Sequence, residues 1–523
     1  MHLSPLDIVV IGLYATFVLA LTHLTAREET EQSKEGKDDF LKQRALPWWA
    51  VGASLIAANI SAEQIIGMSG SAYAFGLAIA SYEWMGAATL LIVGKYFLPI
   101  FLKNQIATMP QFLKRRYGTN IQITMAILWI GVYVFVALTA ILWLGATAVH
   151  TVTGLTLQIS LILLGLFAGN YALYVGMKAA AYADVVQVSM LVLGGLVIVY
   201  FALERISGGV GVSGLMDGFN LLMARAPDHF HLILKPDNPF YKYVPGISVL
   251  VGGMWIINLS YFGFNQFIIQ RALTAKSIRE VQNGVVLAAF LKLLVPLLVV
   301  LPGVAAVILV PHLSRPDEAY PKLMTLLPSG LLGLVFVALV AAIVASMRSA
   351  LSSIATIFTN DVLRIVRKTT NERQLVIAGR LVAIASLVVA MIAANPLLGH
   401  FDQAFQYIQE YNGFFTPGIV AVFLLGIFWN RATEAGALVA AVGSPLISIT
   451  YWKFFPEIPF MNRVAYVFLF CLGLAISVSY LQRNKPRNST IDVKNVDYST
   501  SANFNIASLA VIAILVALYA VWW

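Results

Sequence analysis

The stretch from Ser54 to Gly70, SLIAANISAEQIIGMSG, places polar side chains inside an otherwise apolar segment. Asn59 and Gln64 can each donate and accept hydrogen bonds, which suits the binding of a polar ligand. The tripeptide Asn59-Ile60-Ser61 is also a weak helix former, because Asn and Ser side chains compete for backbone hydrogen bonds. Two interpretations stay open. Either the helix breaks and its freed carbonyls suit a cation such as Na⁺, or it continues and its small and polar residues only pack against neighbours.

Four further apolar segments carry polar side chains of the same kinds. Asn258 and Tyr261 are three residues apart and therefore share one face of a helix. The complete set contains Glu83 in IASYEWMG, Asn258 and Tyr261 in WIINLSYFGFNQF, Lys292 in AAFLKLLVP, and Gln403, Gln406 and Gln409 in FDQAFQYIQEYNG.

Amides, a carboxylate and an ammonium group from separate segments are what a neutral, polyhydroxylated ligand needs. They exchange hydrogen bonds with hydroxyl groups, while an aromatic ring covers the apolar face of a sugar. The alternative is a set of interhelical hydrogen bonds that only hold a bundle together, at about 0.6 kcal/mol each. Such bonds seldom include a lysine and a glutamate in the middle of an apolar segment, so a ligand site is the preferred interpretation.

Enzymatic chemistry is not indicated. The seven histidines are scattered, and the chain contains no HExxH motif, no phosphate-binding glycine loop and no nucleophile elbow. His229 and His231 could pair on a metal, but no third ligand is evident. Cys471 is the only cysteine, which excludes a disulfide framework and a cysteine-based metal site. The net charge of +9 is distributed between apolar runs, and nucleic-acid binding is therefore not expected.

The elements that must position these residues are membrane helices. The chain is 59% hydrophobic and only 11% charged, with a mean hydropathy of +0.81, whereas soluble domains carry about 25% charged residues. A bilayer core needs roughly 20 apolar residues in a helix. We predict an all-α polytopic membrane protein with fourteen spans, near 5–24, 46–73, 78–103, 121–150, 156–176, 180–204, 246–270, 281–312, 328–364, 375–395, 402–429, 432–452, 462–482 and 504–522.

Positive charge alternates between the connections. The odd-numbered connections carry clusters of Lys and Arg, such as Arg364, Arg367, Lys368 and Arg373 after the ninth span. By the positive-inside rule these connections are cytoplasmic, and both termini then face outward. The connection 205–245 contains Gly, Pro and Asp and is expected to be an external loop with short helices.

Several long motifs resemble the bacterial sodium/glucose–galactose branch of the sodium/solute symporter family. They are LPWWAVGASLIAANISAEQIIGMSGSAYAFGLAIASYEWM, GFNQFIIQR, AAFLKLLVP, ATIFTNDV and QAFQYIQEY. The resemblance implies one transporter domain over 1–523, with two inverted five-helix repeats of LeuT type near 46–204 and 246–429. The helices 5–24, 432–452, 462–482 and 504–522 are then peripheral. It also implies a multi-pass protein of the bacterial inner membrane that functions as a monomer.

The resemblance further implies a role for individual residues. The sugar-binding positions are Asn59, Gln64, Glu83, Asn258, Lys292 and Gln409, with Tyr261 stacking on the sugar as an inner gate. The outer hydrophobic gate is Met68, Tyr82 and Phe405. The sodium site takes the carbonyls of Ala57, Ile60 and Ala342 and the hydroxyl of Ser346.

Three positions depart from the family pattern. Gly86 replaces a serine that contacts sugar, and Ala345 replaces a second serine hydroxyl at the sodium site. Arg348 stands where relatives have a small or hydroxylated residue, about one turn from that site. One hypothesis is that Arg348 pairs with Asp184 and weakens or replaces Na⁺ coupling. The alternative is that Arg348 reaches cytoplasmic water and leaves the ion site working.

The sequence therefore predicts a sodium-coupled symporter for a glucose- or galactose-like sugar that works by alternating access. Na⁺ is the expected coupling ion, and a sugar and the lipid bilayer are the expected partners. One alternative is a Na⁺-independent or proton-coupled sugar transporter, and another is a membrane sugar sensor, against which the lack of a cytoplasmic domain counts.

Overall fold

The computed structural model is helical wherever regular structure is described. It describes residues 3–16, 47–61, 63–106, 108–174, 177–265, 269, 277–367, 371–482 and 491–523, with the backbone alone at 57, 58, 171–174, 177–186 and 372. Within these ranges, ten helical stretches are long and apolar enough to cross a membrane. The predicted all-helical membrane fold is thus confirmed, but the count of fourteen is not. One reason is that the second and seventh predicted spans are interrupted and neither forms one long helix.

The first half of the fold begins with the short apolar helix Pro5–Thr16. Broad π-helical turns and short 3₁₀ turns alternate with α-helix over most of this half. Its elements are α2 (Trp48–Asn59), η1 (Glu63–Met68), α3 (Ser69–Phe75), η2 (Gly76–Ala80), α4 (Ser81–Ile92), η3 (Val93–Phe97), α5 (Leu98–Lys103), α6 (Met109–Arg116), α7 (Thr119–Val132), η4 (Tyr133–Leu138), α8 (Thr139–Thr153), α9 (Leu157–Tyr174) and α10 (Met177–Ser207).

The connection 205–245, which the sequence predicts to be external, contains the expected short helices, α11 (Gly211–Arg225) and η5 (Pro227–Phe230). The second half then follows, and its longest helix is α15. Its elements are α12 (Ser248–Val251), α13 (Gly253–Phe264), α15 (Ile278–Leu309), η6 (Pro316–Glu318), α16 (Ala319–Met324), α17 (Leu331–Ile357), η7 (Phe358–Leu363), α18 (Arg364–Arg367), α19 (Glu372–Leu398), α20 (Ala404–Phe428), α21 (Glu434–Phe454), α22 (Phe460–Leu481) and α23 (Ala502–Val521).

The two predicted five-helix repeats begin with the same irregularity. The first helix of each repeat stops within the span, α2 at Asn59 and α13 at Phe264. The following residues, Ile60 and Asn265, have extended backbones with ψ of 100° and 123°. Since a chain in a bilayer tolerates non-helical backbone only inside protein or beside a wet cavity, both breaks must face the interior of the bundle.

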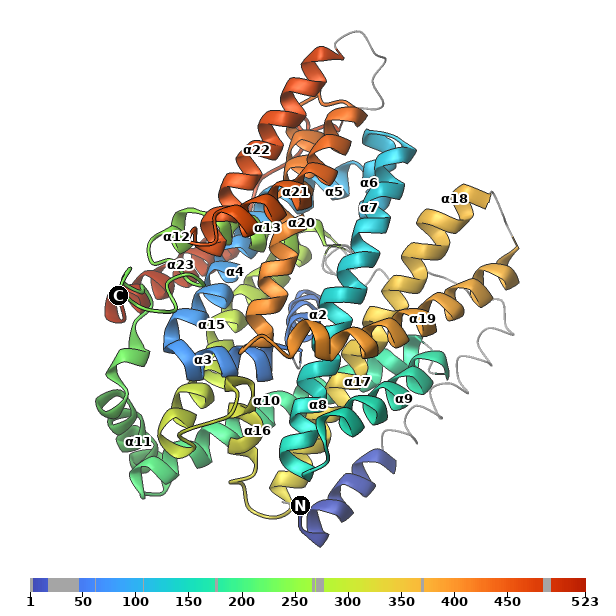
Figure 1. Cartoon of the computed structure of the whole chain (residues 1–523). Coiled ribbons are helices and arrows are strands. Elements are labelled where there is room, and N and C mark those ends of the chain that lie inside the picture. The colour runs from blue at the N-terminus through green and yellow to red at the C-terminus, as the bar shows by residue number, and fades with distance from the viewer. Residues whose placement is uncertain are drawn as a thin grey trace.

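Helix α15 is the central element of one side of the bundle, as Figure 1 shows. It packs against α2, α3, α4 and α10, so it joins elements from the first repeat. The contact is close because Gly303 of α15 lies against α3. A Cβ atom at Gly303 would be 2.2 Å from the carbonyl oxygen of Ser69. A second group, in which α20 packs on α13, α21 and α22, forms the opposite side.

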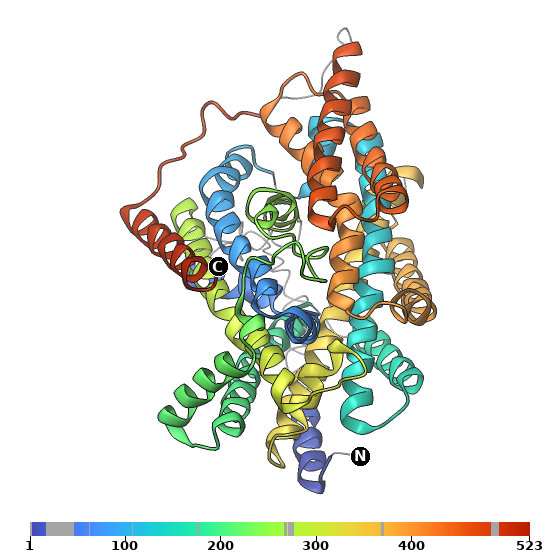
Figure 2. The ribbon, with the colours of Figure 1, turned by 60° about the vertical axis from the view of Figure 1, so that its left-hand side comes forward.

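The C-terminal helix crosses to the first group. The extended segment 491–501 carries the chain away from α22, and α23 lies against α4 and α15 (Figure 2). The backbone amide of Leu232 in the connection 205–245 donates a 2.7 Å hydrogen bond to the carbonyl of Trp522. The end of the chain therefore lies beside the connection 205–245, and the outward position of both stays a prediction.

Candidate functional site

The structure decides between the two interpretations of the Ser54–Gly70 stretch. Helix α2 ends at Asn59, Ile60 is extended with φ −73° and ψ 100°, and a π-helical turn starts at Glu63. The last carbonyls of a helix lack intrahelical partners, so those at the end of α2 are available as ligands. The helix is therefore broken, and the break turns Asn59 and Gln64 into the same region as α4 and α15.

Lys292 and Glu83 form a buried ion pair beside this break. Lys292 Nζ lies 2.5 Å from Glu83 Oε2, and the two residues are only 1% and 2% exposed. Lys292 Nζ also donates to Asn59 Oδ1 at 2.6 Å, while Gln64 Nε2 donates to Glu83 Oε1 at 2.8 Å. Each charge thus has an opposite charge and an amide as partners. Four of the predicted sugar-binding residues, from α2, η1, α4 and α15, meet in one network.

Two other predicted residues on α13 adjoin this network. The Tyr261 hydroxyl hydrogen-bonds the side chain of Asn59. Asn258 is buried and donates to the carbonyl of Met254 at 3.1 Å, one turn earlier in its own helix. A Cβ atom at Gly86 would lie 3.1 Å from Asn258 Oδ1 and 3.0 Å from Lys292 Cε. The departure at Gly86 therefore lies within the polar network.

The three predicted outer-gate residues are all buried. Met68 is fully buried, and the rings of Tyr82 and Phe405 meet edge to face with centroids 5.2 Å apart. Tyr82 is the neighbour of Glu83 in α4, so this aromatic contact joins α4 to α20 directly next to the ion pair. The arrangement covers the network with an apolar layer.

The three glutamines at and after the start of α20, Gln403, Gln406 and Gln409, have different surroundings. Gln403 Oε1 accepts a 2.8 Å hydrogen bond from Ser71 Oγ, and Gln406 Nε2 donates to the same hydroxyl at 3.4 Å. These two amides hold α20 against α3. Gln409, the one that we predicted to bind sugar, lies one turn further along and is partly exposed. The three amides therefore differ in their surroundings, because Ser71 engages Gln403 and Gln406, and sugar binding by Gln409 stays a prediction.

The predicted ion-binding residues lie on two helices. The backbones of Ala57 and Ile60 lie at the end of α2. The structure describes the backbone of Ala57 but not its side chain. Ala342 and Ser346 are one turn apart on α17, buried and half-buried respectively. An ion shared between the two helices stays a prediction.

The predicted coupling pair is also untested. Arg348 is half-buried on α17, close in sequence to Ser346. The Asp184 side chain lies outside the described residues, although its backbone is part of α10. The proposed pairing of Arg348 with Asp184 therefore remains a hypothesis.

Sequence patterns missed two residues that shape the site. Phe262 places its ring 5.0 Å from Lys292 Nζ, a cation–π geometry that adds to the ion pair. The sequence did not distinguish Phe262 from the other aromatic residues around it in WIINLSYFGFNQF. Asp317 of η6 accepts a 2.8 Å hydrogen bond from the backbone amide of Ala404 and so caps α20, which carries Phe405. Because Asp317 lies in a polar connection, it looked like an ordinary loop residue.

The side chains of this network can exchange hydrogen bonds with a polar ligand. Among the described residues, no group of three His, Cys, Asp or Glu side chains is placed to hold a metal ion. Gln64 Oε1 and the Tyr82 hydroxyl are buried, with no hydrogen-bond partner in the described part of the chain. Buried polar atoms without partners are costly. They suit a ligand that brings its own hydroxyl groups.

The chain is similar to sodium-coupled transporters. Residues 40–443 match the model of the sodium:solute symporter family. The chain is 45% identical to the sodium/glucose cotransporter of Vibrio parahaemolyticus, over 100% of this chain and 99% of that protein. It is 33% identical to sodium/myo-inositol cotransporter 2 of Mus musculus, over 86% of this chain and 70% of that protein.

Two solved structures show the same fold. A Na⁺-coupled sialic acid symporter in a substrate-bound, outward-open state superposes with a TM-score of 0.75 at 20% identity, over 92% of this chain and 99% of that one. Mhp1, a nucleobase-cation-symport-1 family transporter, gives 0.52 at 16% identity, over 88% and 97%. The predicted LeuT-type architecture is confirmed by these likenesses, in agreement with the broken first helix of each repeat.

Proposed function

Because the chain belongs to the sodium:solute symporter family, we propose that it is a sodium-coupled symporter for a glucose- or galactose-like sugar. It is a multi-pass membrane protein and not an enzyme. The inward Na⁺ gradient drives uptake, and the protein works in the bacterial inner membrane as a monomer. The observation that carries the proposal is the buried network of Lys292, Glu83, Asn59 and Gln64 beside the broken helix.

The network suggests how a sugar is bound. Lys292 and Glu83 satisfy each other in this arrangement, so a sugar must exchange those bonds for bonds to its own hydroxyl groups. Hydroxyls both donate and accept, which allows one ligand to satisfy an ammonium and a carboxylate together. Tyr261 then supplies the ring that covers the apolar face of the sugar, and Gln409 adds a further amide.

Alternating access requires that the site is closed on one side at a time, by the Tyr82–Phe405 contact on the outer side and by Tyr261 on the inner side. The contact of Tyr82 with Phe405 closes the network on the predicted outer side. An ion between the end of α2 and Ser346 would favour the state in which this contact opens, since a ligand shifts a conformational equilibrium only by its differential affinity. Release inward then requires movement of Tyr261.

Uptake of labelled glucose and galactose by proteoliposomes, with and without an inward Na⁺ gradient, tests the proposal. We expect gradient-dependent uptake that is lost in Gln64→Ala and Lys292→Ala. The control Lys453→Ala removes an exposed lysine at the end of α21 and should transport normally. Normal uptake by both site variants would overturn the site assignment, and absence of any sugar flux in the unmodified protein would overturn the function.

Ala345 and Arg348 favour one second candidate, a sugar transporter with weakened or absent Na⁺ coupling. Ala345 removes a hydroxyl from the predicted ion site, and Arg348 brings a cation near it. The same assay separates the two. Uptake that is unchanged by removal of Na⁺, and that becomes Na⁺-dependent in Arg348→Ser, would support the second candidate.

A further inference from the structure

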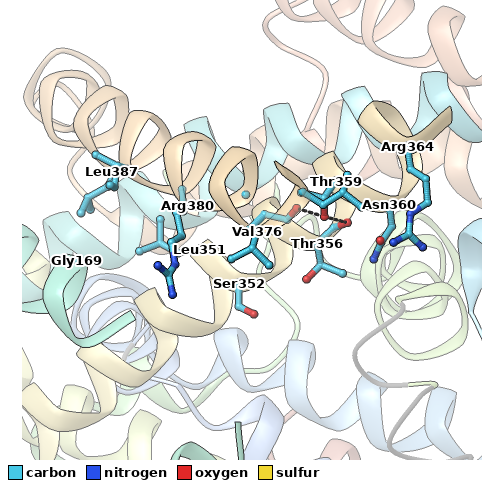
Figure 3. A pocket seen from close by; sticks show the side chains of 15 residues that line it. Gly169, Leu351, Ser352, Thr356, Thr359, Asn360, Arg364, Val376, Arg380 and Leu387 are labelled. Atoms are coloured by element: carbon cyan, nitrogen blue, oxygen red, sulfur yellow. Dashed lines mark hydrogen bonds between the residues drawn. The ribbon is translucent and has the colours of Figure 1, made fainter. Parts of the chain in front are cut away.

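A cavity of about 290 Å³ lies away from the polar network, between α9, α17 and α19. Figure 3 shows its two ends. Leu351 and Leu387 line one end next to Gly169, while Asn360 and Arg364 line the other. Arg380 of α19 lies beside Leu351, and its guanidinium group points to the same side as that of Arg364, with Val376 and Thr356 between the two (Figure 3). The cavity is therefore apolar around Leu387 and Gly169, and two cations lie along the rest of its lining.

The position of Arg380 is unusual for a cation. It lies seven residues inside α19 from Arg373, which corresponds to about 10 Å along a helix. Among the residues that the structure describes, Arg380 makes no hydrogen bond and no ion pair. A charge inside a membrane span is costly unless it is paired. An anion in the cavity would supply that partner.

The cavity lies at the cytoplasmic side of the bilayer. Arg364 belongs to the cluster of positive residues that connects α17 to α19, and such clusters mark cytoplasmic connections. The inner leaflet holds anionic phospholipids, and basic pockets between membrane helices on this side bind their head groups. An acyl chain needs an apolar channel beside the phosphate, which Leu351 and Leu387 provide.

We propose that this cavity binds one anionic phospholipid of the inner leaflet. Its phosphate lies between Arg364 and Arg380, where Asn360 and Thr356 can donate further hydrogen bonds. One acyl chain runs along Leu351 toward Gly169. The two helices approach closely there, since a Cβ atom at Gly169 would lie 2.8 Å from a methyl group of Leu387. The cavity thus depends on close packing of α9 against α19.

Native mass spectrometry of the full-length protein tests this site. The purified protein is stripped of lipid and incubated with phosphatidylglycerol or with phosphatidylcholine of the same chains. We expect one retained phosphatidylglycerol, at least about 5-fold weaker in Arg380→Gln and weaker again when Arg364→Gln is added. The control Arg373→Gln removes an exposed cation of the same helix that does not line the cavity. It should retain the lipid, and Arg380→Lys should retain most of it.

Two further measurements distinguish binding of a phospholipid from binding of a soluble anion. Ile384→Asn places a polar group in the apolar part of the lining and should weaken phosphatidylglycerol retention. Inorganic phosphate at millimolar concentration should not displace the lipid. Equal retention of both lipids, retention that ignores Arg380 and Arg364, or displacement by phosphate would each overturn the proposal. If Arg380→Gln does not fold, Arg364→Gln alone is compared with Arg373→Gln, and it should retain less phosphatidylglycerol than this control.

Discussion

Removal of the Lys292 ammonium group tests the buried ion pair most directly. Lys292→Met keeps the length of the side chain, but among the described residues it leaves the Glu83 carboxylate with Gln64 alone as a hydrogen-bond partner, at 2.8 Å. Both residues are almost fully buried. Breaking a buried pair on one side costs about 3–5 kcal/mol, because the remaining charge is uncompensated. We expect Lys292→Met and Glu83→Gln each to lower the free energy of unfolding by that amount.

The double variant provides the sharper comparison. With Glu83→Gln and Lys292→Met together, no unpaired charge is left in the network. Replacement of a whole buried pair is often neutral, so we expect the double variant to recover most of the lost stability. The two single effects are then strongly non-additive, as expected for residues in direct contact. Uptake of sugar should be absent in all three variants, because stability returns without the binding groups.

Thermal unfolding in one detergent, followed by size-exclusion chromatography, measures the stability of each variant. Lys453→Met is the matched control, since its lysine is exposed at the end of α21. If Lys292→Met alone were as stable as the unmodified protein, the two groups would not carry opposite charges in the folded state. If the double variant still accumulated sugar, the network would not be the binding site.

Gly86→Ala should change the apparent KM for sugar about 2- to 10-fold, because its new Cβ atom would lie 3.0 Å from Lys292 Cε. Uptake kinetics measure this KM, and an unchanged value would show that Gly86 does not line the sugar site. Gly303→Ala should cost about 1–3 kcal/mol in thermal unfolding, since its Cβ atom would lie 2.2 Å from the Ser69 carbonyl oxygen, and unchanged stability would contradict the close approach. Burial raises the pKa of Asp317 from 3.8 to about 7, against the opposing effect of its backbone hydrogen bond. Between these values the folded protein keeps a proton that the unfolded chain has released, so stability falls as pH rises through that window. Asp317→Asn should remove this dependence when Tm at pH 5 is compared with Tm at pH 7.5, and an identical dependence would refute the assignment.

The break in α2 is a feature that the local sequence indicated but left open beside a continuous helix. Asn59-Ile60-Ser61 disfavours a helix through side-chain competition for the backbone, and this is an effect of neighbouring residues alone. The structure ends α2 at Asn59 and leaves Ile60 extended. The external helices between 205 and 245 were predictable for the same reason, since Gly and Pro limit helices locally.

The partners of the polar side chains were not predictable in this way. Gln403, Gln406 and Gln409 look equivalent at their spacing of three, but Ser71 lies more than 300 residues away in sequence and engages the first two. Asp317 was hidden for a related reason. Its carboxylate caps a helix that begins 87 residues later, and no local pattern marks such a pair.

The sequence by itself determined that this chain is a helical membrane protein with polar groups at membrane depth. Apolar runs of about 20 residues and interrupted helical propensity are local properties, and the cost of placing charge among apolar residues acts wherever the chain folds. Only the tertiary structure decided that Lys292 meets Glu83 across 209 residues of sequence. That contact depends on how α15 packs against α2 and α4, which is a matter of the shapes of whole helices.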